Sequence, residues 1–488
     1  MSAIINKTIH GLSWNFKSQM ITQGINFLVA FLLMLYLVPE DFGKFAMVFV
    51  VVRFFQIIRE AGFTVAIIQK KELTQSSLST AFWFQILLAV FIGGLLFYSG
   101  NLFNSFYEET VLNQISFWLS LDFILGSFGL VPTALLRKEL KFKALFKIHL
   151  VAIIISSTVG IGMALGGMGY LSLVGKILSW TVITSFGNFL FIQWKPQFQF
   201  SIKELKSLLR LGLPDTGNYI LWYLTMNTDD FFIGRVIGAS SLGYYNRAYN
   251  IMLLPLLNIS SVLQSVLFST WSKIQDDQSR INRMYLLVSG IIALLACPTM
   301  ILLAVFSEPI INLIFGTNWL PMATTLCILS IIGMFQSVSA LLGVIYIVFD
   351  KNSLAFKINL IASTFTIALI IWSVYVFRSI EVTALVYGIA TLIRLFPTYY
   401  FASKTMGLPT KQLVSPIIFP FIFSIIIGIF GWFLFQILPF ETLILKLIFS
   451  LVFSSLLYFI LCWTFKIPPF MDLLKAIKKY RIEIKKEL

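Results

Sequence analysis

Four basic side chains lie inside long apolar stretches of the chain, where a charge is costly. Arg53 and Arg59 belong to the stretch FAMVFVVVRFFQIIREAGF, residues 45–63, and the other two are Lys176 and Arg394. A basic residue at the centre of a membrane span costs roughly 3 kcal/mol, so four of them would cost on the order of 10 kcal/mol if they faced lipid. They therefore need either acidic partners or a water-filled cavity.

The acidic residues at the same depth do not neutralise this positive charge. They are Glu60, Asp122, Asp229 and Asp230. Two local ion pairs are open to these acids, Arg59 with Glu60 and Asp230 with Arg235, and such pairs would hold helices together. The surplus of cations favours a second interpretation, a cavity between helices that receives an anion.

Arginine suits a phosphate group because its planar guanidinium offers two parallel hydrogen bonds and keeps its charge. We therefore expect a cationic cavity that binds a diphosphate head group, with six candidate residues: Arg53, Arg59, Lys176, Arg235, Arg247 and Arg394. The acids Asp122, Asp229, Asp230 and Glu60 are candidate sites for a coupling proton or sodium ion.

The elements that must position these side chains are membrane helices. Of the 488 residues, 58% are hydrophobic and 12% are charged, and the mean hydropathy is +0.90, which predicts an all-α integral membrane protein. Runs of roughly 20 apolar residues predict about fourteen spans. Their approximate ranges are 18–37, 45–67, 80–99, 115–136, 148–166, 171–192, 217–237, 247–268, 284–306, 322–349, 358–377, 382–402, 415–437 and 443–465.

The distribution of Lys and Arg predicts the orientation of these spans. Most of the 36 Lys and Arg fall in alternate loops and at the two ends of the chain, as in RKELKFKALFK at residues 137–147. The opposite loops are nearly free of positive charge, so both termini are expected in the cytoplasm. SIKELKSLLRLG, residues 201–212, and the basic tail at 466–488 fit helices lying on the inner membrane surface.

Several classes of protein are excluded by the composition. The net charge of +15 sits in short loops rather than on a soluble domain, which argues against a nucleic-acid partner. Two His and three isolated Cys cannot build a histidine metal site or a Cys/His nucleophile pair, so we expect no metal site and no cofactor. No GxxxxGK[ST] motif occurs, and the opening segment MSAIINKTIHGLSWNF lacks the pattern of a cleavable signal peptide.

An internal repeat divides the chain at an offset of about 200 residues. PEDFGKF at residues 39–45 aligns with ASSLGYY at 239–245, which pairs Gly43 with Gly243. With six spans in each half, the halves form a parallel repeat of the kind that transporters use. The predicted domains are two pseudo-symmetric six-helix bundles at 1–200 and 201–402, two further helices at 403–465, and a cytoplasmic tail at 466–488.

Several motifs resemble the Wzx-type polysaccharide flippases, in particular the colanic-acid-exporter branch of the multidrug/oligosaccharidyl-lipid/polysaccharide superfamily. In chain order they are PEDFGKFAMV, GFTVAIIQKKELTQSSLSTAFW, LVPTALLRKELKFK, TDDFFIGRVIGASSLGYYNRAYNIMLLP, FSTWSKIQDDQSRINRMY and LIFGTNWLPM, which together cover most of the first 350 residues. Arg53, Arg59, Arg235 and Arg247 fall within or beside these motif regions, whereas Lys176 and Arg394 are candidates by their burial alone.

The resemblance implies a MATE-like fold of two facing six-helix bundles with two additional C-terminal helices. It implies a flippase, not an enzyme, that moves an undecaprenyl-diphosphate-linked oligosaccharide from the inner to the outer leaflet of a bacterial inner membrane by alternating access. Its partners would be the lipid-linked oligosaccharide, membrane lipids and the polysaccharide polymerase and chain-length machinery, and the flippase would be a monomer. A lipid II flippase, another exporter of the superfamily and, less favoured, a membrane glycan polymerase or ligase stay open as alternatives.

The charge pattern of the loops generates a topology prediction. Reporter fusions near Arg137 and at the C-terminus should both report the cytoplasm, and a fusion near Glu108 should report the outside, because positive loops stay inside. A C-terminus outside the cytoplasm would require an odd number of spans and would contradict the arrangement in two six-helix bundles.

Overall fold

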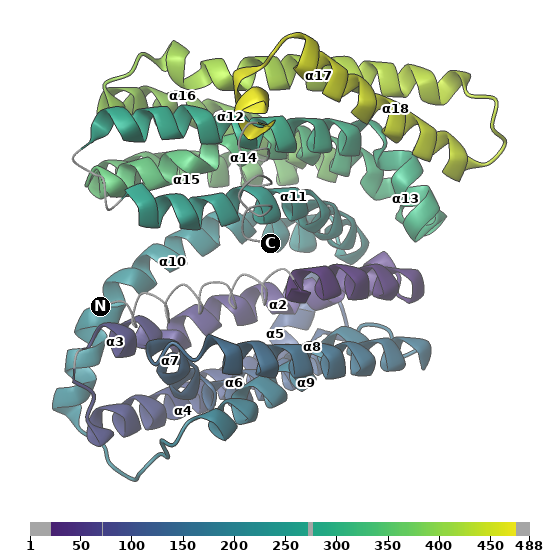
Figure 1. The fold of residues 1–488 in the computed structure, drawn as a ribbon. Coiled ribbons are helices and arrows are strands. Elements are labelled where there is room, and N and C mark those ends of the chain that lie inside the picture. The colour runs from purple at the N-terminus through teal and green to yellow at the C-terminus, as the bar shows by residue number, and fades with distance from the viewer. Residues whose placement is uncertain (1–20, 71, 272–276, 475–488) are drawn as a thin grey trace, which may run out of the picture. The chain divides into compact units, whose positions relative to one another are not determined.

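The computed structural model describes residues 21–70, 72–271 and 277–474, and within these ranges every regular element is a helix (Figure 1). The predicted all-α class is therefore confirmed for the described part of the chain. The opening segment and most of the predicted basic tail lie outside the described residues.

The helices fall into two compact units, Met1–Gly243 and Tyr244–Leu488. The sequence predicted a boundary near residue 200 between membrane bundles, and that assignment stays a prediction. In the first unit, a helix covers Ile21–Tyr36 and is followed by α2 (Pro39–Glu60), α3 (Phe63–Gln69), α4 (Gln75–Tyr98), α5 (Gly100–Tyr107), α6 (Leu112–Ser127), α7 (Leu130–Lys138), α8 (Phe142–Leu165), α9 (Leu171–Gly187), the 3-10 helix η1 (Asn188–Phe191) and α10 (Ile202–Val236).

Helix α11 (Ala239–Trp271) begins in the first unit and continues into the second. The second unit then contains α12 (Gln278–Val305), α13 (Ser307–Phe315), the 3-10 helix η2 (Thr317–Met322), α14 (Ala323–Val348), α15 (Asn352–Phe377), α16 (Ile380–Met406), α17 (Thr410–Ile437) and α18 (Leu443–Thr464). Its helices pack in sequence-distant pairs, notably α12 with α14 and α17.

Each of the fourteen predicted apolar ranges overlaps a helix or a pair of short helices. Within the described residues, nine helices are long and apolar enough to cross a membrane, or ten if the bent pair α6 and α7 forms one span. Helix α2 is not among them because it contains six charged residues, including Arg53 and Arg59, and the helix at Ile21–Tyr36 is shorter. The segment at 201–212, predicted as a separate surface helix, is instead the continuous first part of α10.

Two interruptions in the helices shape the first unit. Helix α2 ends where Ala61 and Gly62 both adopt the left-handed conformation, with φ of 44° and 66°, and α3 continues beyond them. Helices α6 and α7 meet at an angle of 41°. Since backbone groups need partners inside an apolar bundle, such breaks are expected where a polar cavity or a close neighbour lies alongside.

Glycines bring the backbones of α2, α10 and α11 into direct contact. A Cβ atom on Gly43 would lie 1.7 Å from the carbonyl oxygen of Ala239, and one on Gly243 would lie 1.9 Å from that of Pro39. At the other end of α2, a Cβ on Gly62 would lie 2.2 Å from the carbonyl oxygen of Gly212. The glycine pair of the sequence repeat is therefore a reciprocal contact between the first turns of α2 and α11.

This contact predicts opposite effects for two glycine-to-alanine substitutions. Gly43→Ala should lower the free energy of unfolding by about 1–3 kcal/mol, because its Cβ overlaps the backbone of Ala239 and the helices must separate. In α4, Gly94 has no atom within 4 Å of its Cβ position, so Gly94→Ala should be neutral or stabilising by up to about 1 kcal/mol.

Thermal unfolding of the purified variants measures both effects. Equal melting temperatures for Gly43→Ala and Gly94→Ala would contradict the close approach of α2 and α11.

Candidate functional site

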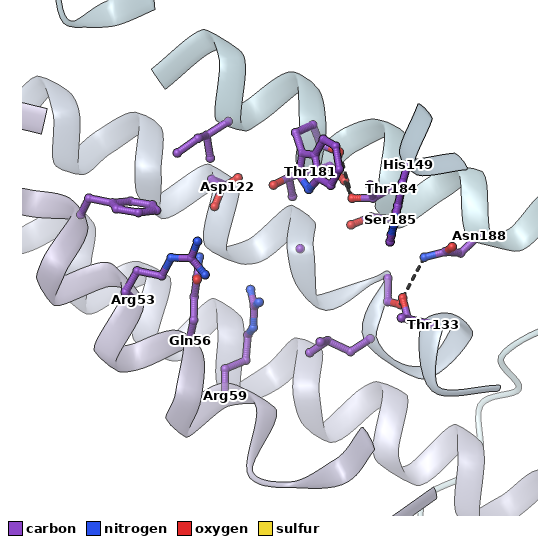
Figure 2. A pocket seen from close by; sticks show the side chains of 16 residues that line it. Arg53, Gln56, Arg59, Asp122, Thr133, His149, Thr181, Thr184, Ser185 and Asn188 are labelled. Atoms are coloured by element: carbon purple, nitrogen blue, oxygen red, sulfur yellow. Dashed lines mark hydrogen bonds between the residues drawn. The ribbon is translucent and has the colours of Figure 1, made fainter. Parts of the chain in front are cut away.

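A cavity of about 310 Å³ lies within the first unit and is surrounded by α2, α6, α7, α8, α9 and η1 (Figure 2). It brings together Arg53, Arg59 and Asp122, three of the residues that the sequence singled out. Its lining residues are Phe49, Arg53, Gln56, Arg59, Asp122, Gly126, Gly129, Leu130, Thr133, His149, Ile177, Trp180, Thr181, Thr184, Ser185 and Asn188.

Helix α2 supplies one polar stripe. Arg53, Gln56 and Arg59 are spaced three residues apart, so they lie on neighbouring turns of one helix face, and Figure 2 shows all three directed into the cavity. The remaining residues of this segment are mainly apolar, which explains why α2 forms a helix that presents polar groups on one side only.

The two arginines differ in exposure. Arg53 is the exposed member of the lining, and its guanidinium lies 5.0 Å from the ring centre of Phe49. The Arg59 side chain is 7% exposed. Arg53 is therefore placed to meet a ligand at the entrance, and Arg59 lies deeper.

The guanidinium of Arg59 contacts its neighbours but satisfies only part of its hydrogen-bonding capacity. Its Nη1 donates a hydrogen bond to the carbonyl oxygen of Phe123, and its guanidinium lies 4.6 Å from the ring centre of the same residue. Gly126 leaves the space for it, because a Cβ there would lie 3.0 Å from Nη1. Within the described residues no carboxylate lies within 4.0 Å of Arg59, and its Nε has no hydrogen-bond partner. The proposed Arg59–Glu60 ion pair is thus not formed.

Asp122 lies opposite α2 on α6 and is 2% exposed. The side chain of Thr181 is within hydrogen-bonding reach of its carboxyl group, and Arg59 and Arg53 are close enough to interact with it electrostatically. Its Oδ1 has no hydrogen-bond partner among the described residues. A carboxylate has about four lone-pair sites, so Asp122 keeps accepting capacity directed at the cavity.

Polar residues from α7, α9 and η1 complete the cavity. Asn188 Nδ2 donates to Thr133 Oγ1 at 2.8 Å, and Thr133 Oγ1 donates to the carbonyl oxygen of Gly129 at 2.6 Å. The rings of His149 and Trp180 lie 5.6 Å apart at 34°. Sequence reasoning missed these residues, although the helical spacing of Thr181, Thr184, Ser185 and Asn188 is a signal that could have found them.

The structure places the other predicted cations elsewhere. Lys176 lies on α9 outside the cavity lining, with its Nζ 3.5 Å from Asn26 Oδ1. Arg235 forms an ion pair of 2.8 Å with Glu108, a partner that the sequence interpretation did not consider, and it also lies over the ring of Phe106.

Arg247 and Arg394 belong to the second unit. Arg247 donates a hydrogen bond of 2.6 Å to Asn246 Oδ1, and Arg394 is half-buried on α16. Neither residue is among those that line the cavity of the first unit. Their role in binding stays a prediction.

The remaining predicted acids lie outside the cavity lining. Asp229 on α10 is 4% exposed, and Asp230 interacts electrostatically with Tyr107 and Tyr223. Glu60 is half-buried at the end of α2. Among the described residues, no group of three or more His, Cys, Asp or Glu could hold a metal ion.

Comparisons with known sequences place the chain among polysaccharide biosynthesis proteins. The family model described as "Polysaccharide biosynthesis protein" matches residues 32–324. The lipopolysaccharide biosynthesis protein WzxC of Escherichia coli (strain K12) is 25% identical over 422 residues, which cover 86% of each chain. The teichuronic acid biosynthesis protein TuaB of Bacillus subtilis (strain 168) is 26% identical over 387 residues, covering 77% of this chain and 78% of TuaB.

A solved structure shares the fold. The lipid II flippase MurJ in an inward closed conformation aligns with a TM-score of 0.75 and 17% identity, covering 94% of this chain and 99% of the MurJ chain. At that identity the likeness is evidence for the fold alone. Together with the apolar helices, these similarities show a multi-pass membrane protein.

The closeness of Arg59 and Asp122 predicts a coupled effect on stability. Arg59→Met should lower the free energy of unfolding, because it leaves the buried Asp122 without its nearby cation. The double variant Arg59→Met with Asp122→Asn should regain part of the lost free energy of unfolding, with a coupling energy of about 0.5–3 kcal/mol.

Thermal unfolding of the single and double variants measures this coupling. Arg235→Met, which removes a surface ion pair with the largely exposed Glu108, serves as a control and should change stability by less than about 1 kcal/mol. Simple additivity of the Arg59 and Asp122 effects would show that the two charges do not interact.

Proposed function

The chain belongs to the polysaccharide biosynthesis protein family, and we propose that it is a flippase for an undecaprenyl-diphosphate-linked oligosaccharide. It moves this repeat unit from the inner to the outer leaflet of the bacterial inner membrane for assembly of an O-antigen, a capsule or an exopolysaccharide. The names of WzxC and TuaB, both polysaccharide biosynthesis proteins, support this substrate class.

One observation supports anion recognition above the others, the cavity that contains an exposed Arg53 and a buried Arg59 within a bundle of apolar helices. A buried arginine without an ion pair among the described residues is costly unless a ligand compensates it. The substrate brings a negatively charged diphosphate to this cavity, and the exposed guanidinium of Arg53 can bind phosphate oxygens in a bidentate manner.

The proposed mechanism is alternating access by two six-helix bundles within about fourteen spans, with two additional C-terminal helices and both termini in the cytoplasm. The membrane potential favours outward movement of the anionic lipid by about 2.3 kcal/mol per charge per 100 mV. Asp122, Asp229, Asp230 and Glu60 are the candidate sites for a coupled cation, and Lys176, Arg235, Arg247 and Arg394 are further candidates for substrate contact.

The other functions are less well supported. Lipid II is the substrate named for MurJ, but that likeness concerns the fold, whereas the sequence relatives are named for polysaccharides. An exporter of cationic drugs would need an acidic cavity, and the charge of this one is mainly basic. A polymerase or ligase would need catalytic groups outside the membrane on a large loop, and within the described residues the connections between helices are short.

As a flippase, the protein acts as a monomer beside the polymerase and chain-length machinery that use the translocated unit. Membrane lipids surround it, and it needs no cofactor.

The test of the proposed function is export in cells. Arg53→Ala should stop polysaccharide export and cause undecaprenyl-diphosphate-linked oligosaccharides to accumulate, because the entrance cation is lost. Arg53→Lys should restore only part of the export, since lysine keeps the charge but lacks the planar pair of donors. Surface polysaccharide and lipid-linked oligosaccharides are both quantified, the latter by mass spectrometry.

Arg283→Ala is a matched control, because Arg283 is an exposed arginine on α12 in the second unit. The Arg283→Ala variant should export polysaccharide normally when it is present at the same protein level. Normal export by Arg53→Ala would remove the main support for diphosphate recognition, and a gene deletion without accumulated lipid-linked oligosaccharide would refute the flippase itself.

A further inference from the structure

The cavity of the first unit contains buried hydrogen-bond donors and acceptors that have no partner among the residues that the structure describes. They are one donor, Arg59 Nε, and two acceptors, Asp122 Oδ1 and Asn188 Oδ1. All three residues line the cavity, and their side chains are at most 7% exposed. Leaving such groups unsatisfied costs about 1–3 kcal/mol each, so the arrangement indicates a ligand that supplies their partners.

From this arrangement we propose that the inner part of the cavity binds the hydroxyl groups of the first sugar of the substrate, and that the diphosphate binds at Arg53. This inference rests on the proposed function and specifies which part of the substrate each end of the cavity recognises.

The orientation of the Asn188 amide follows from its neighbours. The hydroxyl of Thr133 donates its hydrogen to the carbonyl oxygen of Gly129, so toward Asn188 it can only accept. The group of Asn188 that faces Thr133 at 2.8 Å is therefore the NH₂ group, and Oδ1 is the free acceptor. Figure 2 shows this Asn188–Thr133 contact on the side of the cavity away from Arg53.

A phosphate group does not fit this inner part. A fully ionised phosphate offers acceptors only, which would leave Asp122 Oδ1 and Asn188 Oδ1 unsatisfied, and the Asp122 carboxylate would repel it. A hydroxyl group both donates and accepts, so hydroxyls of one ligand can satisfy the Arg59 donor and both acceptors.

Size and surface of the cavity also suit a sugar. Its volume of about 310 Å³ is roughly ten times the volume share of one water molecule, enough for a hexose. Trp180 and His149 contribute neighbouring aromatic surface, and Thr184 and Ser185 add hydroxyl groups.

Arg53 is the residue that would bind the diphosphate. It is the exposed member of the lining, one helical turn before Gln56 and nearly two turns before Arg59 on α2, a separation of about 9 Å along the helix axis between Arg53 and Arg59. That separation allows a diphosphate at the entrance and its attached sugar further in.

The experiment compares lipids with and without a sugar. The full-length protein in lipid nanodiscs is titrated with undecaprenyl diphosphate and with undecaprenyl diphosphate carrying one glucose or one galactose, and binding is measured by native mass spectrometry. At least one hexose-linked lipid should bind about tenfold or more tightly than the bare lipid, the effect expected from two or three additional hydrogen bonds.

Variants assign that preference to the cavity. Asn188→Leu should reduce the sugar preference to about onefold. Thr133→Val, which removes the hydroxyl that accepts from the Asn188 amide, should reduce it in part. Arg53→Ala should weaken the binding of all three lipids by the same factor. Asn282→Leu, at a half-buried asparagine of the second unit whose Nδ2 donates to the carbonyl oxygen of Met406, is the matched control and should keep the preference.

The possible failures are distinguishable. Equal binding of bare and hexose-linked lipids by the unmodified protein, or a sugar preference that survives in both Asn188→Leu and Thr133→Val, would overturn the sugar site and leave the flippase proposal intact. Absence of binding by any of the lipids would overturn both.

Discussion

The cost of holding a guanidinium group inside an apolar bundle is the constraint on which the rest of the first unit depends. Arg59 is 7% exposed, and its guanidinium donates a hydrogen bond to the backbone carbonyl of Phe123 and lies over the ring of the same residue. Gly126 has no side chain at the point where the guanidinium lies, and Asp122 supplies negative charge nearby without forming an ion pair within 4.0 Å. A fully paired arginine would be more stable but unavailable to a ligand, so this incomplete compensation is what a binding site requires.

Helix α2, which carries this charge, is positioned by glycines. Close contacts at Gly43, Gly62, Gly212 and Gly243 let α2 approach α10 and the start of α11 to the distance of backbone atoms. Such approach is typical of membrane helices, which associate by packing because lipid gives them no hydrophobic driving force. It fixes the face of α2 that is turned toward α6 and α9, and therefore the direction in which Arg53, Gln56 and Arg59 point.

Membership in the polysaccharide biosynthesis protein family and the cavity together give a consistent account of substrate recognition. In the proposed account, charge attracts the diphosphate at the entrance, and the mixture of donors and acceptors further in selects for hydroxyl groups. The first feature is common to every substrate built on the same lipid carrier, whereas the second depends on the attached sugar. Relatives named for polymers as different as lipopolysaccharide and teichuronic acid are consistent with such a division, because the shared part and the variable part of the substrate meet different residues.

The sequence by itself determined the helical class and the position of the apolar helices, and it singled out Arg53, Arg59 and Asp122 as candidates, because hydropathy and the cost of a buried charge are local properties. It also found the Gly43–Gly243 repeat, although not the reciprocal contact that those glycines make. Only the tertiary structure decided partners: Arg235 meets Glu108 rather than the nearby Asp230, and Arg59 meets Phe123 rather than Glu60. It also added Asn188, Thr133 and His149 to the site, since only packing brings polar residues on separate helices around one cavity. Hydrogen-bond partners distant in sequence depend on how helices rotate and cross, which is settled by side-chain packing over the whole bundle.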